Sequence, residues 1–361
     1  MAANAHDEGH GRTCGGHGAQ RAKRIGRRLL LSILVFLVVA ELCSRWYWTT
    51  KGLSFWRCQW QIHHTFYPEL KRIEEIAIHP HDGFFDVLVL GGSVVQDQYG
   101  SIGRLLATTL EAETRQKVRV HNLAFEAHTS LDSYYKYRHL HDKQFDLVMV
   151  YHGINEVRAN NCPSSIFRDD YSHYAWYDLI HVAEMAPIWE WLIFSRTLQL
   201  AWRRGIQRLA WRQYVGIHWP NPSWVEHARV IRTAGPFRQN LEKVLDLAAT
   251  KGETVVLMTF SYYLPDEYPD VPSWWMPVEI WGKPKYVANG IHVHNTVIEN
   301  LGRQSPAVVF VDQHRSIPKG MTHFRDICHF TSAGCERFVN NVVNSYRQFV
   351  RGAASPTGKR R

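Results

Sequence analysis

The sequence predicts an α/β protein, a three-layer sandwich in which helices cover both faces of a mainly parallel sheet of five strands, preceded by one transmembrane helix. Three observations support this prediction. Short apolar runs alternate with helical segments from about residue 84 to residue 350, which is typical of parallel strands buried on both faces. Glycine turns follow several of these runs. A longer apolar run near the N-terminus directly follows a basic cluster.

The N-terminal run begins at Leu29 and, extended through residue 48, reaches about 20 residues, the length that crosses ~30 Å of hydrocarbon. Basic residues before it predict a cytoplasmic N-terminus, and the aromatic cluster 46–48 suits the far interface. No small-residue cleavage site follows the run, and Glu41 and Leu42 stand where a lipoprotein site needs small residues. An uncleaved anchor in the cell membrane is therefore favoured over a signal peptide. The following chain is then extracytoplasmic, or periplasmic in a Gram-negative cell.

The expected strands are six or seven residues long and rich in valine, leucine and phenylalanine. They are 85–90, 118–123, 145–151, 254–260 and 307–312. The expected helices repeat apolar residues at helical spacing, and all but the last precede a strand. They are 100–113, 129–143 (with a Ser/Thr cap), 237–250, 288–302 and 332–350.

Two stretches interrupt this order, 157–234, which is rich in tryptophan, and 262–285, which is rich in proline and aromatic residues. Both follow expected strands and should lie over the carboxyl ends of the sheet, where open α/β folds bind ligands. They are either a lid or substrate groove, or structural insertions packed on the core or against the membrane. The predicted organisation is a disordered basic tail (1–28), the anchor (29–48), a juxtamembrane connector (49–83), one domain with these two insertions (84–350) and a flexible basic tail (351–361).

The charge distribution argues against a nucleic-acid partner. The chain of 361 residues has a formal net charge of +9. Residues 1–28 hold six basic and two acidic residues, and residues 351–361 hold four basic residues and no acidic one. The body between the tails is therefore nearly neutral, whereas nucleic-acid binding relies on clustered phosphate contacts. The oligomeric state does not follow from the sequence.

The six cysteines form neither a CxxC pair nor a zinc-ligand spacing. Cys58, Cys162, Cys328 and Cys335 would lie in an oxidising compartment, where disulfides are permitted. They are either paired or simply buried thiols. Cys162 and Cys328 both fall in loops at the expected edge of the site, so a disulfide between them is one hypothesis.

Four segments carry residues that are suited to catalysis. Ser93 follows the first strand in a Gly-Gly-Ser turn, which can expose its hydroxyl, although the Gly-x-Ser-x-Gly elbow of other hydrolases is absent. Asp326 stands three residues before His329, a spacing at which the carboxylate can fix the tautomer of the ring. Asn155 follows the end of the third strand and can donate to an oxyanion. Ala127 follows the second strand, where a backbone N–H can do the same.

Each segment also has an ordinary structural interpretation, namely a glycine turn, an Asp–His hydrogen bond or an Asx turn. Neighbouring residues have similar alternatives. His128 and His152 either contact substrate or pack at the rim, and Glu156 is expected to hold its loop. Arg158 is either an anion contact or a solvated charge.

Together, the order of these segments resembles that of the SGNH hydrolases, the GDSL-like esterase and lipase superfamily, over about residues 84–350. The resemblance implies a flavodoxin-like sheet, Ser93 as nucleophile, His329 as base and Asp326 as its orienting acid. Ser93, Ala127 and Asn155 match the three oxyanion donors, with Ala127 standing where the family usually has glycine. It implies acyl transfer through an acyl-enzyme, with no metal or organic cofactor.

The expected function is that of a membrane-anchored extracytoplasmic serine esterase acting on O-acyl esters of a glycan, lipid or envelope polymer. One alternative is an O-acyltransferase that passes the acyl group to a glycan. The other is a catalytically silent SGNH-like domain that binds a glycan or a protein during envelope assembly. The acyl group and the alcohol do not follow from the sequence.

Overall fold

The computed structural model describes residues 16–50, 55, 63–80, 82–185, 196–218, 221–265, 281–305 and 307–354. Contacts divide the chain into two compact units, residues 1–61 with 186–206, and residues 62–185 with 207–361. The sheet and the candidate site belong to the second unit. The predicted domain boundaries stay predictions, because no finding tests them.

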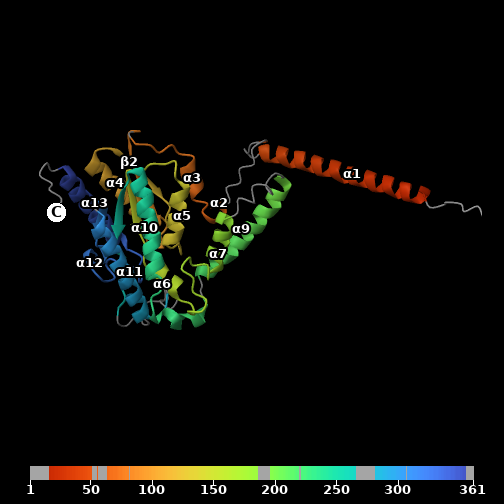
Figure 1. Ribbon diagram of the computed structural model, residues 1–361. Helices are drawn as coiled ribbons and strands as arrows, with labels where there is room; N and C mark the ends of the chain where they lie inside the picture. The colour runs from red at the N-terminus through yellow and green to blue at the C-terminus, as the bar shows by residue number, and fades with distance from the viewer. Residues whose placement is uncertain are drawn as a thin grey trace, which may run out of the picture. The chain divides into compact units, whose positions relative to one another are not determined.

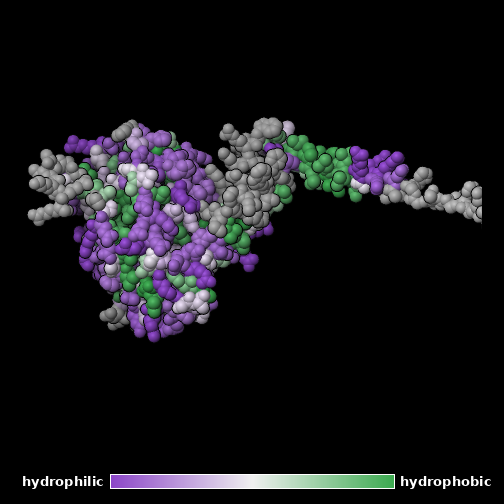
Figure 2. Space-filling model, viewed as in Figure 1, coloured by the Kyte–Doolittle hydropathy of each residue, from purple (hydrophilic) through white to green (hydrophobic). Residues whose placement is uncertain are grey.

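Helix α1 (Gly16–Thr49) is the main described element of the first unit. Its section Lys23–Thr49 is long and apolar enough to cross a membrane. Figure 2 shows a continuous hydrophobic band along α1 with a hydrophilic section at its N-terminal end. Glu41, the acidic residue in the apolar run, is paired with Arg45 one turn further on, at 2.8 Å from its Nε. This i,i+4 pair offsets part of the cost of placing a carboxylate near the apolar section.

The sheet has five strands in the order β2-β1-β3-β4-β5, and all its neighbouring strands are parallel. The strands are β1 (Phe84–Gly91), β2 (Lys117–Asn122), β3 (Leu147–Tyr151), β4 (Thr254–Met258) and β5 (Val308–Val311). In the register of the sheet, Val87 of β1 lies beside both Val120 and Leu147. This strand order is that of flavodoxin-like sheets, so the predicted fold class is confirmed.

Helices cover both faces of the sheet (Figure 1). Helices α4 (Ile102–Thr114) and α13 (Ser332–Ala354) contact each other on one face. Helices α5 (Ser130–His139), α10 (Ala234–Lys251) and α11 (Pro284–Gln304) form the other layer. The remaining helical elements are α2 (His63–Phe66), α3 (Leu70–Glu74), the 3-10 helix η1 (Ser93–Val95), α6 (Ile154–Asn160), α7 (Ala175–Met185), α9 (Arg196–His218), the 3-10 helix η2 (Pro222–Arg229) and α12 (Gln313–Ser316).

The core lies between the sheet and these layers. Strand β3 is buried along its whole length, as is β1 after its first residue, which explains their continuous apolar sequences. The observed elements match the expected ones to within a few residues. The main difference is α5, which ends at His139 rather than near residue 143, because residues 140–143 turn back toward β3 through a hydrogen bond from the N–H of Lys143 to the carbonyl of Leu140.

The first insertion, 157–234, contributes the end of α6, α7, α9 and η2. Of the second insertion, 262–285, residues 266–280 lie outside the described residues. The hypothesis of a lid formed by that segment is therefore untested. The basic tails, apart from residues 16–28 and 351–354, also lie outside the description.

Candidate active site

Three of the residues predicted from the sequence meet at the carboxyl end of the sheet. Ser93 begins η1, directly after β1 and Gly92, whereas His329 and Asp326 lie in the loop before α13. The Oγ of Ser93 is 2.9 Å from Nε2 of His329, and Nδ1 of that ring is 2.7 Å from Oδ2 of Asp326. A serine, a histidine and an aspartate thus form one continuous hydrogen-bonded relay.

The surroundings of Asp326 fix the direction of this relay. Its Oδ1 accepts hydrogen bonds from the backbone N–H groups of Cys328, at 2.9 Å, and His329, at 2.7 Å. Burial on its own raises the pKa of Asp326, but hydrogen bonds and the nearby His329 outweigh it and hold the pKa below its ordinary value. The ionised carboxylate therefore accepts Nδ1–H, which leaves Nε2 of His329 free to accept the Ser93 proton.

Asn155 lies in the first turn of α6, next to the serine. Its Nδ2 donates to the backbone carbonyl of His128 at 2.8 Å. A Cβ added to Gly92 would lie only 2.7 Å from Nδ2 of Asn155 and 3.5 Å from the same carbonyl. The amide is thus packed against the residue before the nucleophile, and Gly92 is the residue type that leaves room for it.

Ala127 adopts a left-handed conformation, with φ +62°. Such a backbone costs an L-residue roughly 1–2 kcal/mol relative to glycine, which gives a physical reason for glycine at this position in the resembled family. The guanidinium of Arg158, which is buried, donates to the carbonyl of Ala127 and holds the loop. Within the described part of the chain, the N–H groups of Ala127 and Ser93 donate to no protein acceptor.

The neighbouring polar residues make contacts within the protein. His152 is buried and hydrogen-bonded to Oγ of Ser133 at 2.7 Å, and burial lowers its pKa to about 3. His128 packs among aromatic rings that include Phe125 and Trp176. Glu156 accepts the backbone N–H of Ser130, which confirms that it holds a loop.

Of the two alternatives for Arg158, an anion contact or a solvated charge, the solvated charge is wrong. Its side chain is buried and bound to the carbonyl of Ala127, and its own carbonyl accepts a hydrogen bond from Tyr174 at 3.0 Å. The hypothesis of a Cys162–Cys328 disulfide is also wrong, because both are buried free thiols. Cys335 is likewise a buried free thiol, and Cys58 lies outside the described residues.

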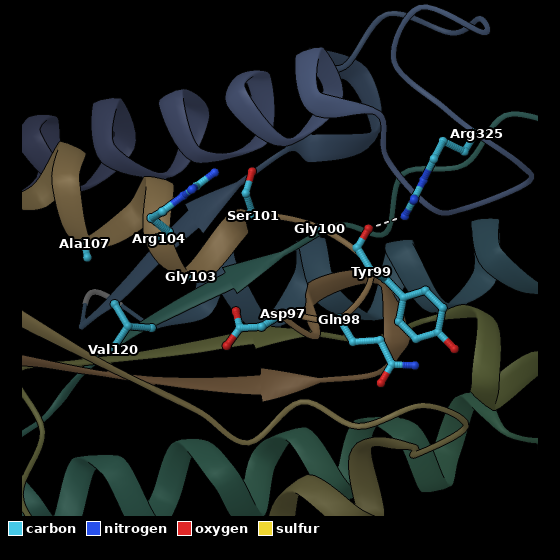
Figure 3. Close-up of a pocket in the computed structure, with 10 residues that line it drawn as sticks. All are labelled: Asp97, Gln98, Tyr99, Gly100, Ser101, Gly103, Arg104, Ala107, Val120 and Arg325. Atoms are coloured by element: carbon cyan, nitrogen blue, oxygen red, sulfur yellow. Dashed lines mark hydrogen bonds between the residues drawn. The ribbon is translucent and has the colours of Figure 1, made fainter.

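An open groove of about 700 Å³ lies along turn 97–101 and the first turns of α4 (Figure 3). Its wall includes Tyr99, whose ring stacks on that of His329, and Arg325, whose guanidinium donates to the backbone carbonyl of Tyr99. Arg104 of α4 also lines it, and Asp97 supplies a carboxylate. Tyr99 and Asp97 were not predicted from the sequence, because turn 96–100 has no pattern that distinguishes it from an ordinary loop. A volume of this size falls within the ~300–1,000 Å³ range of ligand pockets.

A small hollow lies at Ser93 itself. It is lined by residues that include Gly92, Asn155, Gly153 and Phe260. Its volume of about 10 Å³ is close to the space of one water molecule. Ser93 thus lines the narrow hollow, whereas the wide groove is connected to the relay through Tyr99, which stacks on His329.

Two groups of side chains in the described residues have the composition of a metal site. One is Asp326, Cys328 and His329, in which the relay already uses both ring nitrogens of the histidine. The other, His63, His64 and Glu74, belongs to α2 and α3. No feature of the relay requires a metal.

Comparisons with known proteins give structural likeness only. No family model matches the sequence, and no curated protein matches it. A GDSL-like lipase from Bacteroides thetaiotaomicron is similar at 13% identity, over 79% of this chain and 98% of that chain, with a TM-score of 0.46. An acetylxylan esterase from Geobacillus stearothermophilus is similar at 13% identity, over 72% and 93%, with a TM-score of 0.43. A lipase from a goat rumen metagenome has 10% identity, over 72% and 97%, with a TM-score of 0.39. At such identities the function has to be argued from the site itself.

Proposed function

We propose that this chain is a serine esterase of the SGNH type. The observation that supports this most is the relay from Ser93 through His329 to Asp326, because its two distances of 2.9 and 2.7 Å join a nucleophile, a base and an orienting acid. The relay lies at the carboxyl end of a parallel sheet, where α/β proteins bind their ligands. Its four key residue types occur in the order that the resemblance to the superfamily implies.

The proposed reaction has two steps. The Oγ of Ser93 attacks the ester carbonyl while Nε2 of His329 takes the hydroxyl proton, and the ester C–O bond breaks as the histidine returns that proton to the leaving alcohol. Water then attacks the acyl-enzyme, with His329 again as base, and releases the carboxylic acid and the free serine. Asp326 keeps its negative charge throughout and stabilises the imidazolium.

The developing oxyanion would be held by three donors. Nδ2 of Asn155 carries two hydrogens, of which one binds the carbonyl of His128 and the other is available to the oxyanion. The N–H groups of Ser93 and Ala127, which donate to no described protein acceptor, would supply the other two. The positive φ of Ala127 retains the backbone geometry for which glycine is preferred, so a methyl group there is compatible with the role.

The hollow at Ser93 and the groove beside Tyr99 support a preference for small acyl groups. The hollow beside Asn155 and Phe260 has room for about a methyl-sized group, whereas the groove beside Tyr99 is wide and partly polar. An acetyl group would fit the hollow, and a bulky alcohol such as a glycan would lie in the groove. We therefore infer acetyl esters of a glycan or envelope polymer as the substrate class, without a metal or organic cofactor in the reaction.

The proposed location is the outer side of the cell membrane, with α1 as an uncleaved anchor and its basic N-terminal end in the cytoplasm. The apolar section Lys23–Thr49 and the basic residues before it support this orientation. A protease-protection assay on spheroplasts, with tags at the two termini, tests the orientation. Protection of a C-terminal tag, or loss of an N-terminal tag during maturation, would contradict it.

The test of the enzymatic proposal is labelling of the full-length protein, purified in detergent, with a fluorophosphonate probe. Wild type and Ser165→Ala, which alters an exposed serine, should be labelled, whereas Ser93→Ala and His329→Ala should not. An unlabelled wild type, or equal labelling of all four proteins, would overturn the proposal.

Substrate preference is tested with p-nitrophenyl esters of increasing chain length. Acetate should be the best substrate by kcat/KM, because longer chains exceed the hollow beside Ser93. Higher rates with octanoate would place the acyl chain in the wide groove instead. Product analysis with an added acceptor sugar then separates hydrolysis from acyl transfer.

A further inference from the structure

A cluster of histidines and a carboxylate lies at the start of the second unit, outside the candidate active site. His63 and His64 belong to α2, and Glu74 ends α3. Nε2 of His63 is 2.8 Å from Oε1 of Glu74, and Nε2 of His64 is 2.6 Å from Oε2. The ligand atoms of all three residues lie within 4.8 Å of one another. A third imidazole, that of His139 at the end of α5, stacks on His63 with 3.8 Å between ring centroids.

The spacing of these atoms is close to that of ligands around a small cation. Zinc ligands at ~2.0–2.2 Å in a tetrahedral arrangement lie about 3.4 Å from one another. The observed nitrogen-to-oxygen distances are shorter than this by less than 1 Å, so small side-chain rotations would open the cluster enough to admit an ion. We propose that His63, His64 and Glu74 bind one zinc ion.

The donor set favours zinc over magnesium or calcium. Two imidazole nitrogens and one carboxylate oxygen are ligands typical of zinc, whereas magnesium and calcium prefer oxygen alone. Imidazole binds zinc as a neutral ring through one of its nitrogens. Each ring would carry its proton on Nδ1 when Nε2 binds the ion. Water completes the coordination.

Residues around the cluster would position the ligands. The stacked ring of His139 limits rotation of His63. The Nζ of Lys143 donates to the backbone carbonyl of Glu74 at 3.0 Å, which ties the end of α3 to the segment after α5. Lys71, an exposed residue of α3, is a nearby cation whose charge would repel a zinc ion bound beside His64. Its flexible, solvated side chain can move away, so the repulsion is small.

A zinc ion here would have a structural role. Helices α2 and α3 have only four and five residues, too few to be stable in isolation. The ion would cross-link the two helices where the chain enters the second unit. The cluster shares no residue with the relay of Ser93, His329 and Asp326, so the proposal is independent of the esterase function.

The experiment measures metal binding by the full-length protein in detergent after treatment with a chelator. His6, His10 and His17 are replaced by alanine in every sample, because a histidine-rich tail also binds metals. Competition with a chromophoric chelator should reveal one zinc ion per chain, and zinc should raise Tm. Bound Co²⁺ should show visible absorption of low-coordinate cobalt without a thiolate charge-transfer band.

Variants locate the ion. His64→Ala and Glu74→Gln should weaken zinc binding by about 10- to 100-fold or more, and they should lose the zinc-dependent rise in Tm. His139→Ala should have a smaller effect, because that ring positions a ligand. The matched control is His79→Ala, an exposed histidine in the same segment, which should bind as the parent does. A metal-free Tm equal to that of the parent shows that a variant is folded.

Two results would overturn the proposal. One is the absence of saturable binding at one ion per chain, or equal affinity in His64→Ala, Glu74→Gln and His79→Ala. The other is a thiolate charge-transfer band that disappears in Cys328→Ser, which would place the metal beside His329 instead.

Discussion

The ring of Tyr99 stacks on that of His329, with 4.9 Å between centroids and an interplanar angle of 28°. The hydroxyl of Tyr99 donates to Oε2 of Glu126 at 2.6 Å, and the backbone carbonyl of Tyr99 accepts from Arg325. Asp326 fixes one edge of the imidazole, whereas Tyr99 covers one of its faces. The wall of the groove therefore also positions His329, the proposed base.

Removal of the Tyr99 ring should impair catalysis more than removal of its hydroxyl. Tyr99→Ala frees the face of His329, and a misplacement of ~1 Å can cost about 10²-fold in rate. Tyr99→Phe retains the stack and should stay near wild type in kcat. Steady-state kinetics with p-nitrophenyl acetate gives kcat and KM for both variants. Equal losses of kcat in Tyr99→Ala and Tyr99→Phe would assign the effect to the hydrogen bond with Glu126.

The contact between Gly92 and Asn155 predicts a second effect on activity. Asn155→Ala removes a proposed oxyanion donor and should lower kcat by about 10²–10³-fold. Gly92→Ala places a methyl group 2.7 Å from Nδ2 of Asn155 and should displace the amide, with a loss in the same direction. Gly205→Ala, at a position in α9 where an added Cβ meets nothing within 4 Å, is the matched control and should leave kcat unchanged.

The two substitutions should not be additive, because both act on the same amide. Kinetics of the double variant Gly92→Ala/Asn155→Ala tests this directly. A double variant whose loss equals the product of the two single losses would show that the two residues act independently.

The sequence predicted the sheet and the relay because both depend on local patterns. Apolar runs specify the strands, and parallel strands bring their carboxyl ends to one edge. Ser93 and His329, 236 residues apart, therefore meet as the order of their segments predicts. Asp326 was placed by its spacing of three residues alone, which allows the loop to fold the carboxylate onto the ring.

The contacts that the sequence did not predict join loops without periodicity. Tyr99 lies in a turn whose path to His329 depends on the loop before α13. Arg158 was expected to face an anion or solvent, yet its charge is buried against the carbonyl of Ala127, 31 residues away. The Cys162–Cys328 hypothesis failed for a similar reason, since two loops can lie at one edge of a sheet without bringing their thiols together.

Ala127→Gly should stabilise the protein. The left-handed backbone costs alanine roughly 1–2 kcal/mol, whereas the extra freedom of glycine in the unfolded chain costs roughly 0.5–1 kcal/mol. The free energy of unfolding should therefore rise by up to about 1.5 kcal/mol, measured by urea denaturation of the full-length protein in detergent. Ala112→Gly, an exposed position in α4, is the matched control and should be destabilised by a similar amount. Destabilisation of both variants would mean that the loop tolerates alanine without strain.

Glu156 predicts a pH dependence of stability. Burial raises its pKa from 4.5 to about 7 despite the hydrogen bond from the N–H of Ser130, and its Oε2 has no partner among the described residues. The folded state therefore keeps the proton of Glu156 at pH values where the unfolded state has released it. The stability of the folded state falls as pH rises from about 4.5 to 7, by a total of about 3 kcal/mol at ~1.36 kcal/mol per pKa unit.

Glu156→Gln removes this ionisation and keeps an oxygen that accepts the N–H of Ser130. Urea denaturation at pH 5 and pH 8 should show a smaller loss of stability in the variant than in wild type, because the glutamine has no proton to release. Glu336→Gln, an exposed residue of α13, is the control and should follow the wild-type pH dependence. If Glu156→Gln loses as much stability between the two pH values as wild type does, Glu156 is already ionised in the folded protein at pH 5, and the buried carboxylate is then stabilised by the hydrogen bond alone.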